Sequence, residues 1–139
     1  MRYKFEEVLY ADLNNRQKEN YNYQKISGIL ASFGFLTIRL SDDWNGADFI
    51  AQHISGQTLL RVQLKSRFCI DKKYLGKDLH ICFRIGEDWY FVPHDSIVKW
   101  ALKNTKILDT NSWVTNGSYS VPSLPKVINL RLEKYKIPM

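Results

Sequence analysis

Two runs of alternating residues follow each other in the middle of the chain. Residues 46–54 alternate small or apolar side chains with polar ones, and residues 57–65 do so after the pair Ser55 and Gly56. Alternation on both sides of a glycine turn predicts two antiparallel strands joined as a β-hairpin. One face of this hairpin is apolar, which predicts that it packs against the core. Its members are Ala47, Phe49, Ala51, Leu60, Val62 and Leu64.

The other face of the hairpin gathers polar residues from both strands. If Ser55 and Gly56 form the turn, counting outward places Asp48 opposite Gln63. Directly opposed residues have Cβ atoms about 5 Å apart. Lys65 follows Gln63 by two positions and therefore projects from the same face. The pattern predicts a carboxylate, an amide and an amine side by side.

A helical pattern precedes the hairpin. Apolar residues recur at spacings of three and four between Asn14 and Phe33, which predicts a helix with one buried stripe that ends at Gly34. Glu19 precedes Tyr23 by one turn and extends this stripe. An acid near the start of a helix is also favoured by the helix dipole, so Glu19 has a purely structural explanation as well.

The remaining patterns predict further strands and helices. A strand is expected at 36–40, followed by a turn over 42–46 in which Asp42 and Asp43 are additional candidate metal ligands. Further strands are expected at 79–83 and 88–92, on either side of Gly86. A helix is expected to begin at 93–96, with Ile97, Val98, Ala101 and Leu102 as its apolar face. A long polar loop over 104–122 then leads to a last helix, which is capped by Ser123 and has Pro125 in its first turn. The predicted fold class is α/β, with a central mixed β-sheet flanked by helices in a single domain spanning residues 1–139.

Composition narrows the class of protein. The chain has 139 residues, of which 45% are hydrophobic and 24% charged, which is typical of a globular domain. It contains no run of 18 apolar residues and begins without an apolar signal region, so neither a membrane span nor secretion is expected. Cys69 and Cys82 are too few and too far apart for a disulfide scaffold or a zinc ribbon, and a cytoplasmic location is expected.

The net charge of +6 permits a polyanionic partner. Basic residues cluster directly after the candidate hairpin, at Lys65, Arg67, Lys72, Lys73 and Lys77. Basic side chains beside an acidic metal-binding centre suit a phosphate backbone that is held against a cation. We therefore expect Arg67, Lys72, Lys73 and Lys77 to bind nucleic acid. The alternative is the ordinary solvated surface of a basic protein.

Asp48 together with Gln63, Leu64 and Lys65 resembles the active-site motif of the PD-(D/E)XK nucleases, the restriction-endonuclease-like superfamily. Asp48 matches the motif aspartate, and Gln63-Leu64-Lys65 matches the E-x-K element with Gln in place of Glu, a pattern found in Mrr-like restriction enzymes. The order of helix, strand and hairpin is similar to that of the archaeal Holliday junction resolvases. The resemblance covers residues 13–92.

The resemblance implies a site for Mg²⁺ or Mn²⁺. Asp48 would hold the metal ion, with the Gln63 amide oxygen and the Leu64 backbone carbonyl as further ligands. Lys65 would position the nucleophile or stabilise charge on the scissile phosphate.

Nucleases of this class often bring an acid to the metal from the first helix, which makes Glu19 the candidate for that role. Counting back from Gly34 instead places Tyr23 at the usual position of that acid, one turn away.

Three functions remain open from the sequence. The first is a metal-dependent DNA endonuclease, with branched or modified DNA as candidate substrates. The second is a nuclease fold that binds DNA without cutting it, which Gln63 favours because it removes a negative charge from the metal site. The third is a structural or interaction protein in which Asp48 and Lys65 form only a cross-strand ion pair. We favour the first narrowly over the second, and either over the third.

A homodimer is also expected. The nucleases that this chain resembles commonly act as two-fold dimers, because two DNA strands of opposite polarity need two symmetric sites, and a small domain offers little surface to hold a duplex alone. Trp100 and Trp113 lie outside the strand patterns and are expected to leave apolar surface for a partner subunit.

Overall fold

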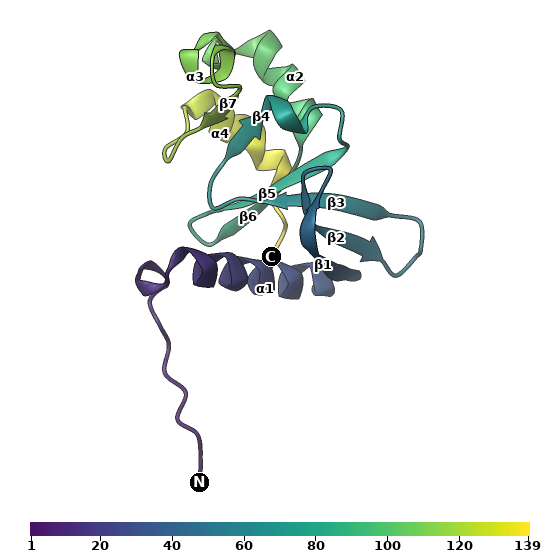
Figure 1. Ribbon diagram of the computed structural model, residues 1–139, viewed down its shortest axis with the longest axis vertical. Coiled ribbons are helices and arrows are strands. Elements are labelled where there is room, and N and C mark those ends of the chain that lie inside the picture. The colour runs from purple at the N-terminus through teal and green to yellow at the C-terminus, as the bar shows by residue number, and fades with distance from the viewer.

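A mixed five-stranded sheet forms the centre of the molecule (Figure 1). The structure is a computed structural model, which describes residues 1–139 with the exception of the side chain of Asp43. The sheet order is β1-β2-β3-β5-β6; β3 and β5 run parallel, and the other neighbours are antiparallel. The strands are β1 (Phe35–Trp44), β2 (Ala47–His53), β3 (Leu59–Leu64), β5 (Leu79–Ile85) and β6 (Asp88–Pro93).

Helices flank this sheet on both sides, which confirms the predicted α/β class. Figure 1 shows α1 (Asn15–Ser32) along one side and three shorter helices gathered on the other. These are α2 (His94–Asn104), α3 (Asn111–Val114) and α4 (Lys126–Leu132), which lie with a small sheet of β4 (Cys69–Asp71) and β7 (Ser118–Ser120). Single turns of 3₁₀-helix occur at η1 (Tyr10–Asp12), η2 (Lys72–Tyr74), η3 (Ile107–Asp109) and η4 (Glu133–Tyr135). Of the helices described, none has the length and apolar character needed to cross a bilayer.

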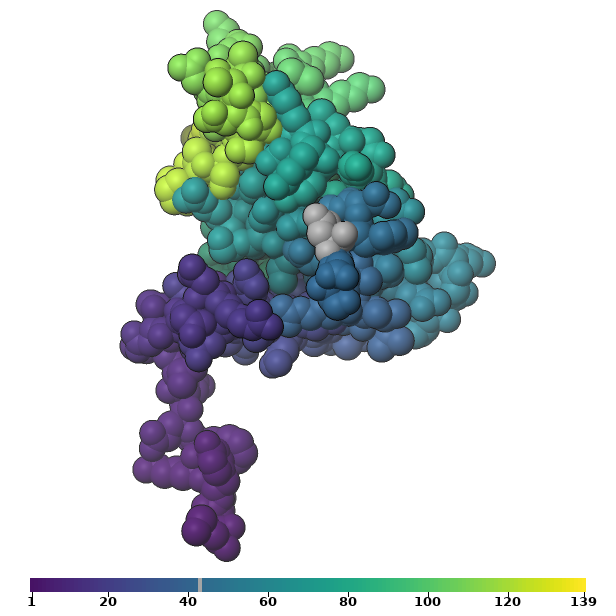
Figure 2. Space-filling model, in the orientation of Figure 1, coloured from purple at the N-terminus to yellow at the C-terminus, as the bar shows by residue number. Residues whose placement is uncertain are grey.

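The hydrophobic core is divided between the two faces of the sheet. On the α1 side, Ile26 and Leu30 pack with Phe49, Ala51 and Val62, all of which are buried. On the other side, β5 and β6 pack against α2 and α4. Five members of the apolar face predicted for the hairpin, Phe49, Ala51, Leu60, Val62 and Leu64, belong to the cluster on the α1 side, whereas Ala47 is buried in the cluster on the other side. The first nine residues are exposed and extend away from this body (Figure 2).

The β1–β2 connection differs from the expected turn over 42–46. Strand β1 continues to Trp44, which pairs with Ala47, and the turn is the pair Asn45 and Gly46. Both have positive φ, 53° and 84°, as a tight hairpin turn requires, and Asn-Gly is the pair best suited to it. The β1–β2 register shifts between Arg39 and Trp44. The expectation that Asp42 lies in a turn is wrong, since this residue belongs to the strand.

The β2–β3 hairpin has the predicted register with a wider loop. Phe49 pairs with Val62 and Ala51 with Leu60, in the register counted from the sequence. Strand β2 ends at His53, however, and the pairing is closed by the His53 N–H, which donates to the carbonyl of residue 58 at 2.9 Å. A four-residue loop over 54–57 therefore replaces the two-residue turn without changing which residues face each other.

The stretch over 104–122, expected to be a loop, contains η3, α3 and β7. Three large side chains of this stretch, Leu108, Trp113 and Tyr119, are buried in the core on the α2 side. Burial of their apolar surface is what holds a mostly polar segment against the body. The expectations of a long loop and of Trp113 as exposed apolar surface are wrong for this reason.

Two details of the flanking helices also differ from expectation. Helix α2 buries its apolar stripe as predicted, except that Leu102 is 61% exposed. Helix α4 begins after Pro125, which occupies the N-cap position, and no side chain caps it. Ser123 therefore does not have the capping role expected for it.

Candidate active site

The Asp48 carboxylate bridges β2 and β3 where their backbones part. The last backbone pair of the ladder is Phe49 with Val62, and the same register continued by one step places Asp48 opposite Gln63. Asp48 Oδ2 accepts a hydrogen bond from the Leu64 N–H at 2.8 Å. A side-chain acceptor thus takes over from the ladder, and it orients the carboxylate toward the strand that carries Gln63.

Gly46, in the turn directly before β2, allows a close approach of Leu79 and Tyr74. Its φ is +84°, and a Cβ built at this position would lie 2.8 Å from Leu79 Cδ1 and 3.1 Å from Tyr74 Cδ1. Any side chain here would have to displace one of these two residues. Glycine is therefore needed for both the turn and the close contact with Tyr74 and Leu79.

Lys65 is half-buried, and its Nζ lies 5.5 Å from the centre of the Tyr74 ring. Burial alone would lower the pKa of Lys65, since it disfavours the charged amine. The hydrogen bond with Tyr74 and the electrostatic influence of Tyr74, Cys69 and Asp48 outweigh burial, so the pKa of Lys65 is raised. Lys65 is consequently an ammonium ion at neutral pH.

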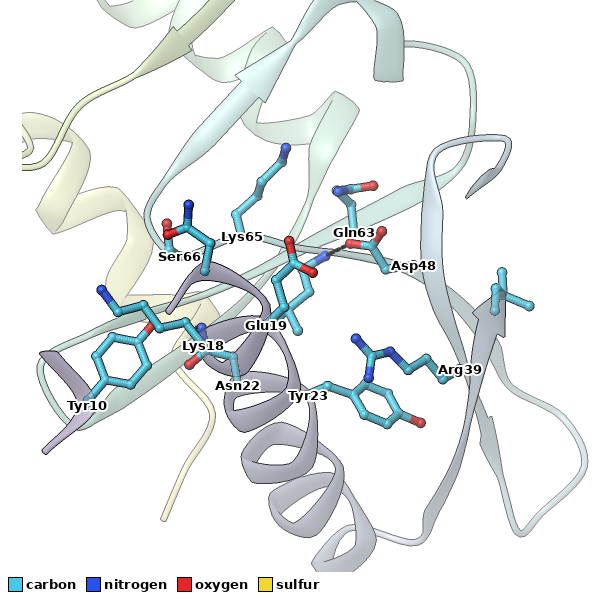
Figure 3. A pocket seen from close by; sticks show the side chains of 13 residues that line it. Tyr10, Lys18, Glu19, Asn22, Tyr23, Arg39, Asp48, Gln63, Lys65 and Ser66 are labelled. Carbon is cyan, nitrogen blue, oxygen red and sulfur yellow. Dashed lines mark hydrogen bonds between the residues drawn. The ribbon is translucent and has the colours of Figure 1, made fainter. Parts of the chain in front are cut away.

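Helix α1 brings polar side chains toward this hairpin. A capping box defines its start: Asn14 Oδ1 accepts from the Gln17 N–H at 2.8 Å, and Gln17 Oε1 accepts from the Asn14 N–H at 2.9 Å. The helical spacing then places Glu19, Asn22 and Tyr23 on one face. Figure 3 shows Glu19 extending from α1 toward the hairpin.

These residues line one hollow of about 650 Å³, which we call the cleft (Figure 3). All four predicted catalytic residues, Glu19, Asp48, Gln63 and Lys65, line it together with Leu64. Of the other lining residues, Tyr23 is the alternative considered at the helical acid position. Seven were not placed in the site from the sequence: Tyr10, Asn15, Lys18, Asn22, Arg39, Leu40 and Ser66. The helical spacing of residues 18, 19, 22 and 23 was the one signal that could have found some of them.

Tyr23 has a structural role in the cleft. Its ring packs at 5.3 Å from that of Phe49, and its hydroxyl is 3.0 Å from Thr37 Oγ1. These contacts fasten α1 to β1 and β2. Of the two residues considered for the helical acid position, Glu19 is the one that brings a carboxylate to the cleft.

Asn22 and Arg39 add further polar chemistry. The Asn22 side chain is buried; its Nδ2 donates to the Tyr10 hydroxyl at 3.0 Å, and its Oδ1 has no partner among the described residues. Arg39 donates to Asn20 Oδ1 at 2.7 Å and lies 5.0 Å from the centre of the Tyr23 ring. Arg39 therefore presents a second ordered cation to the cleft, from a strand that the sequence did not connect with the site.

The residues expected to bind nucleic acid do not line the cleft. Arg67 donates to Ser120 Oγ at 2.9 Å, beyond the end of β3. Lys72 lies over Trp113, and Lys73 lies over the ring of Tyr74. The fourth such residue, Lys77, is half-buried after η2. These four side chains lie outside the site itself, and only the last three share one segment, residues 72–77.

A buried histidine holds this basic segment in place. His94 Nε2 accepts from the Asp71 N–H at 3.1 Å, so its other nitrogen, Nδ1, carries the proton and lies 3.0 Å from Asp95 Oδ1. Asp95 Oδ2 in turn accepts from the Gly76 N–H at 3.0 Å, and Asp71 Oδ1 accepts from the Lys73 N–H at 2.9 Å. Burial lowers the pKa of His94, although Asp95 acts in the opposite direction. The arrangement requires neutral imidazole.

The donor set of the cleft fits a hard divalent cation. Mg²⁺ takes oxygen ligands and is commonly held by one or two carboxylates, with water and phosphate oxygens completing its shell. Glu19 and Asp48 supply two carboxylates, and Gln63 supplies a neutral amide oxygen. Among the described side chains, no three of His, Cys, Asp or Glu come together as a metal cluster. Asp43, considered earlier as a ligand, has its side chain outside the described part of the chain.

Two solved structures are similar to this chain. A Holliday junction resolvase from the archaeal hyperthermophile Archaeoglobus fulgidus is 15% identical, with a TM-score of 0.46, over 56% of this chain and 74% of that one. A bacterial homing endonuclease is 16% identical, also with a TM-score of 0.46, over 88% of this chain and 94% of that one. No protein-family model and no curated protein matches the chain.

Proposed function

We propose that this chain is a metal-dependent DNA endonuclease that hydrolyses phosphodiester bonds in the cleft. The observation that supports this proposal is the meeting of two carboxylates and one ammonium ion from three separate elements: Glu19 from α1, Asp48 from β2 and Lys65 from the end of β3. Carboxylates suit a divalent metal ion, and the ammonium suits the phosphate that the metal ion would contact.

Asp48, Glu19, Gln63 and the Leu64 carbonyl would hold Mg²⁺ or Mn²⁺. The N–H and the carbonyl of a residue in an extended strand point toward the same neighbouring strand. Since the Leu64 N–H donates to Asp48, the Leu64 carbonyl is expected on the Asp48 side as well. The bound metal ion would lower the pKa of a water molecule and polarise the phosphate.

Lys65 would stabilise negative charge on the scissile phosphate. Its raised pKa keeps it cationic, and half-burial strengthens its interaction with a charge that develops nearby. Lys18 and Arg39 line the same cleft and would hold flanking phosphates, which contributes affinity without reading sequence. Arg67, Lys72, Lys73 and Lys77 would extend this contact along the DNA backbone.

The second candidate is a protein that binds DNA without cutting it. The observation that favours it is Gln63, whose amide leaves the site with one negative charge fewer than the nuclease motif. In this case the cleft would still contact phosphates through Lys65, Lys18 and Arg39.

Incubation with plasmid and branched DNA separates these functions. Cleavage in Mg²⁺ or Mn²⁺ that stops with EDTA is the result expected for the endonuclease. Binding in a gel shift without cleavage in either metal would favour the second candidate. Absence of both would leave the interaction-protein alternative, in which Asp48 and Lys65 form only an ion pair.

A further inference from the structure

The outer face of α2 forms a second hollow, which shares no residue with the cleft. It encloses about 450 Å³ and is lined by Ser96, Lys99, Trp100, Lys103, Asn104 and Arg131. Five of these residues recur at helical spacing along α2, opposite its buried stripe, and Arg131 comes from the end of α4. We call it the α2–α4 hollow.

Three cations converge on the α2–α4 hollow without a balancing acid. Lys99 and Lys103 are exposed and four positions apart on the helix, where like charges repel. None of its lining residues is Asp or Glu, and among the described residues neither lysine nor Arg131 belongs to an ion pair. The hollow is therefore a concentrated positive site whose repulsion a bound anion would relieve.

Arg131 is held in a fixed position there. Its guanidinium carbon lies 5.4 Å from the centre of the Trp100 ring, and its Nε is buried without a hydrogen-bond partner among the described residues. Trp100 in turn packs against the core. A guanidinium stacked on a supported indole is pre-ordered, so it loses little freedom when it binds a planar or tetrahedral oxyanion.

We propose that the α2–α4 hollow is a phosphate-binding site separate from the cleft. The Arg131 guanidinium and the two ammonium groups donate charge-assisted hydrogen bonds to phosphate oxygens, and the Ser96 hydroxyl is a further donor. The phosphate comes from one of two sources: a nucleic-acid backbone that also occupies the cleft, or a free phosphorylated molecule. The first source rests on the proposed function; the second does not.

Titration calorimetry with inorganic pyrophosphate, in metal-free buffer at low salt, tests the site without DNA or cleavage. The variant Lys99→Gln/Lys103→Gln removes two charges from the hollow, and we expect its Kd to rise about tenfold. Lys106→Gln/Lys134→Gln removes the same charge from exposed lysines outside both hollows and is expected to bind as the wild type does. Arg131→Lys keeps the positive charge but loses the planar guanidinium that can donate two parallel hydrogen bonds, so it should also weaken binding. Thermal melts confirm that each variant is folded.

Three results would contradict the proposed phosphate site. The wild type could fail to bind pyrophosphate, or the two double variants could be weakened equally. In the third case, Lys65→Ala loses pyrophosphate binding while Lys99→Gln/Lys103→Gln keeps it. The last would place the anion in the cleft.

Salt titrations of duplex DNA binding in EDTA identify the source of the phosphate. If the backbone supplies it, the negative slope of log K against log salt should become less steep by about 2 in Lys99→Gln/Lys103→Gln and stay unchanged in the control pair. If the slope is unchanged in both double variants while only Lys99→Gln/Lys103→Gln binds pyrophosphate more weakly, the hollow is assigned to a free phosphorylated molecule. Absence of DNA binding by every form would contradict the proposed function while the pyrophosphate result stands by itself.

Discussion

At the scale of single residues, the charge of the cleft depends on very few groups. Glu19 and Asp48 carry its two carboxylates, and Gln63 stands where the nuclease motif has an acid. An amide oxygen is an uncharged ligand, and ligand charge is a main determinant of affinity for hard cations. Weak metal binding by the wild type is therefore expected, and one added charge should change it.

Gln63→Glu is expected to bind Mg²⁺ and Mn²⁺ more tightly and to cleave at lower metal concentration. The added carboxylate would lie opposite Asp48, where a cation relieves the repulsion between the two. Gln52→Glu adds the same charge to an exposed position of β2 outside the cleft and should leave the metal requirement unchanged. Titration of cleavage rate against metal concentration gives the comparison. Equal responses of the two variants would mean that residue 63 contacts no metal ion.

Gly46→Ala tests the close contact behind Asp48. The new methyl group would collide with Leu79 and Tyr74 in addition to straining a positive φ, and we expect unfolding to become easier by about 2–4 kcal/mol. Gly56→Ala has the same backbone strain at φ +74° but meets nothing within 4 Å, so it should cost about 1–2 kcal/mol. Urea unfolding measures both. A Gly46 variant no less stable than the Gly56 variant would show that Tyr74 and Leu79 move away freely.

At the scale of elements, the pairing of the β2–β3 hairpin was predictable from the sequence, whereas the position of the basic segment 72–77 was not. Alternation in two neighbouring runs determines which residues share a face, and the wider loop preserved that pairing. The position of residues 72–77 depends instead on His94, a contact between distant parts of the chain. The same holds for Arg39, which enters the cleft only when β1 packs beside the hairpin. Local patterns contain no signal for such contacts.

The His94 arrangement predicts a loss of stability in mild acid. Its pKa in the folded chain is lowered, so the unfolded chain takes up a proton first and folding stability declines as pH falls below about 6.5. Burial lowers the pKa of His80 as well and contributes in the same direction. Urea unfolding between about pH 7 and pH 5 should show this slope.

His94→Gln is the informative variant for this slope. This variant is expected to be less stable at neutral pH by about 1–3 kcal/mol, because the hydrogen bond between His94 and Asp95 is lost. Its free energy of unfolding should also depend less steeply on pH. His80→Gln removes only the His80 part and serves as the comparison. If His94→Gln keeps the full wild-type slope, the buried imidazole is not its source.

At the scale of the whole molecule, the general architecture followed from the sequence, and its C-terminal part did not. A mixed sheet flanked by helices was expected from strand and helix periodicity. The small β4–β7 sheet was missed because its strands are three residues long and are held by burial of Trp113 and Tyr119 rather than by their own pattern. That burial also removes Trp113 from the surface on which a partner subunit was expected to pack.

We still expect a homodimer, on the symmetry argument alone. Two clefts related by a two-fold axis would meet strands of opposite polarity. Light scattering at micromolar concentration, with and without duplex DNA, should give twice the mass of the chain in at least the DNA-bound state. A monomer under both conditions would contradict the dimer without affecting the cleft.

The most direct test of the cleft is metal-dependent cleavage by alanine variants at matched positions. Asp48→Ala and Lys65→Ala are expected to abolish cleavage of plasmid DNA in Mg²⁺ or Mn²⁺ while DNA binding persists. Asp109→Ala removes an exposed acid of η3 outside the cleft, and Lys106→Ala removes an exposed lysine; both variants should cut at the wild-type rate. Cleavage that persists undiminished in Asp48→Ala and Lys65→Ala would contradict the assignment of this cleft as the active site.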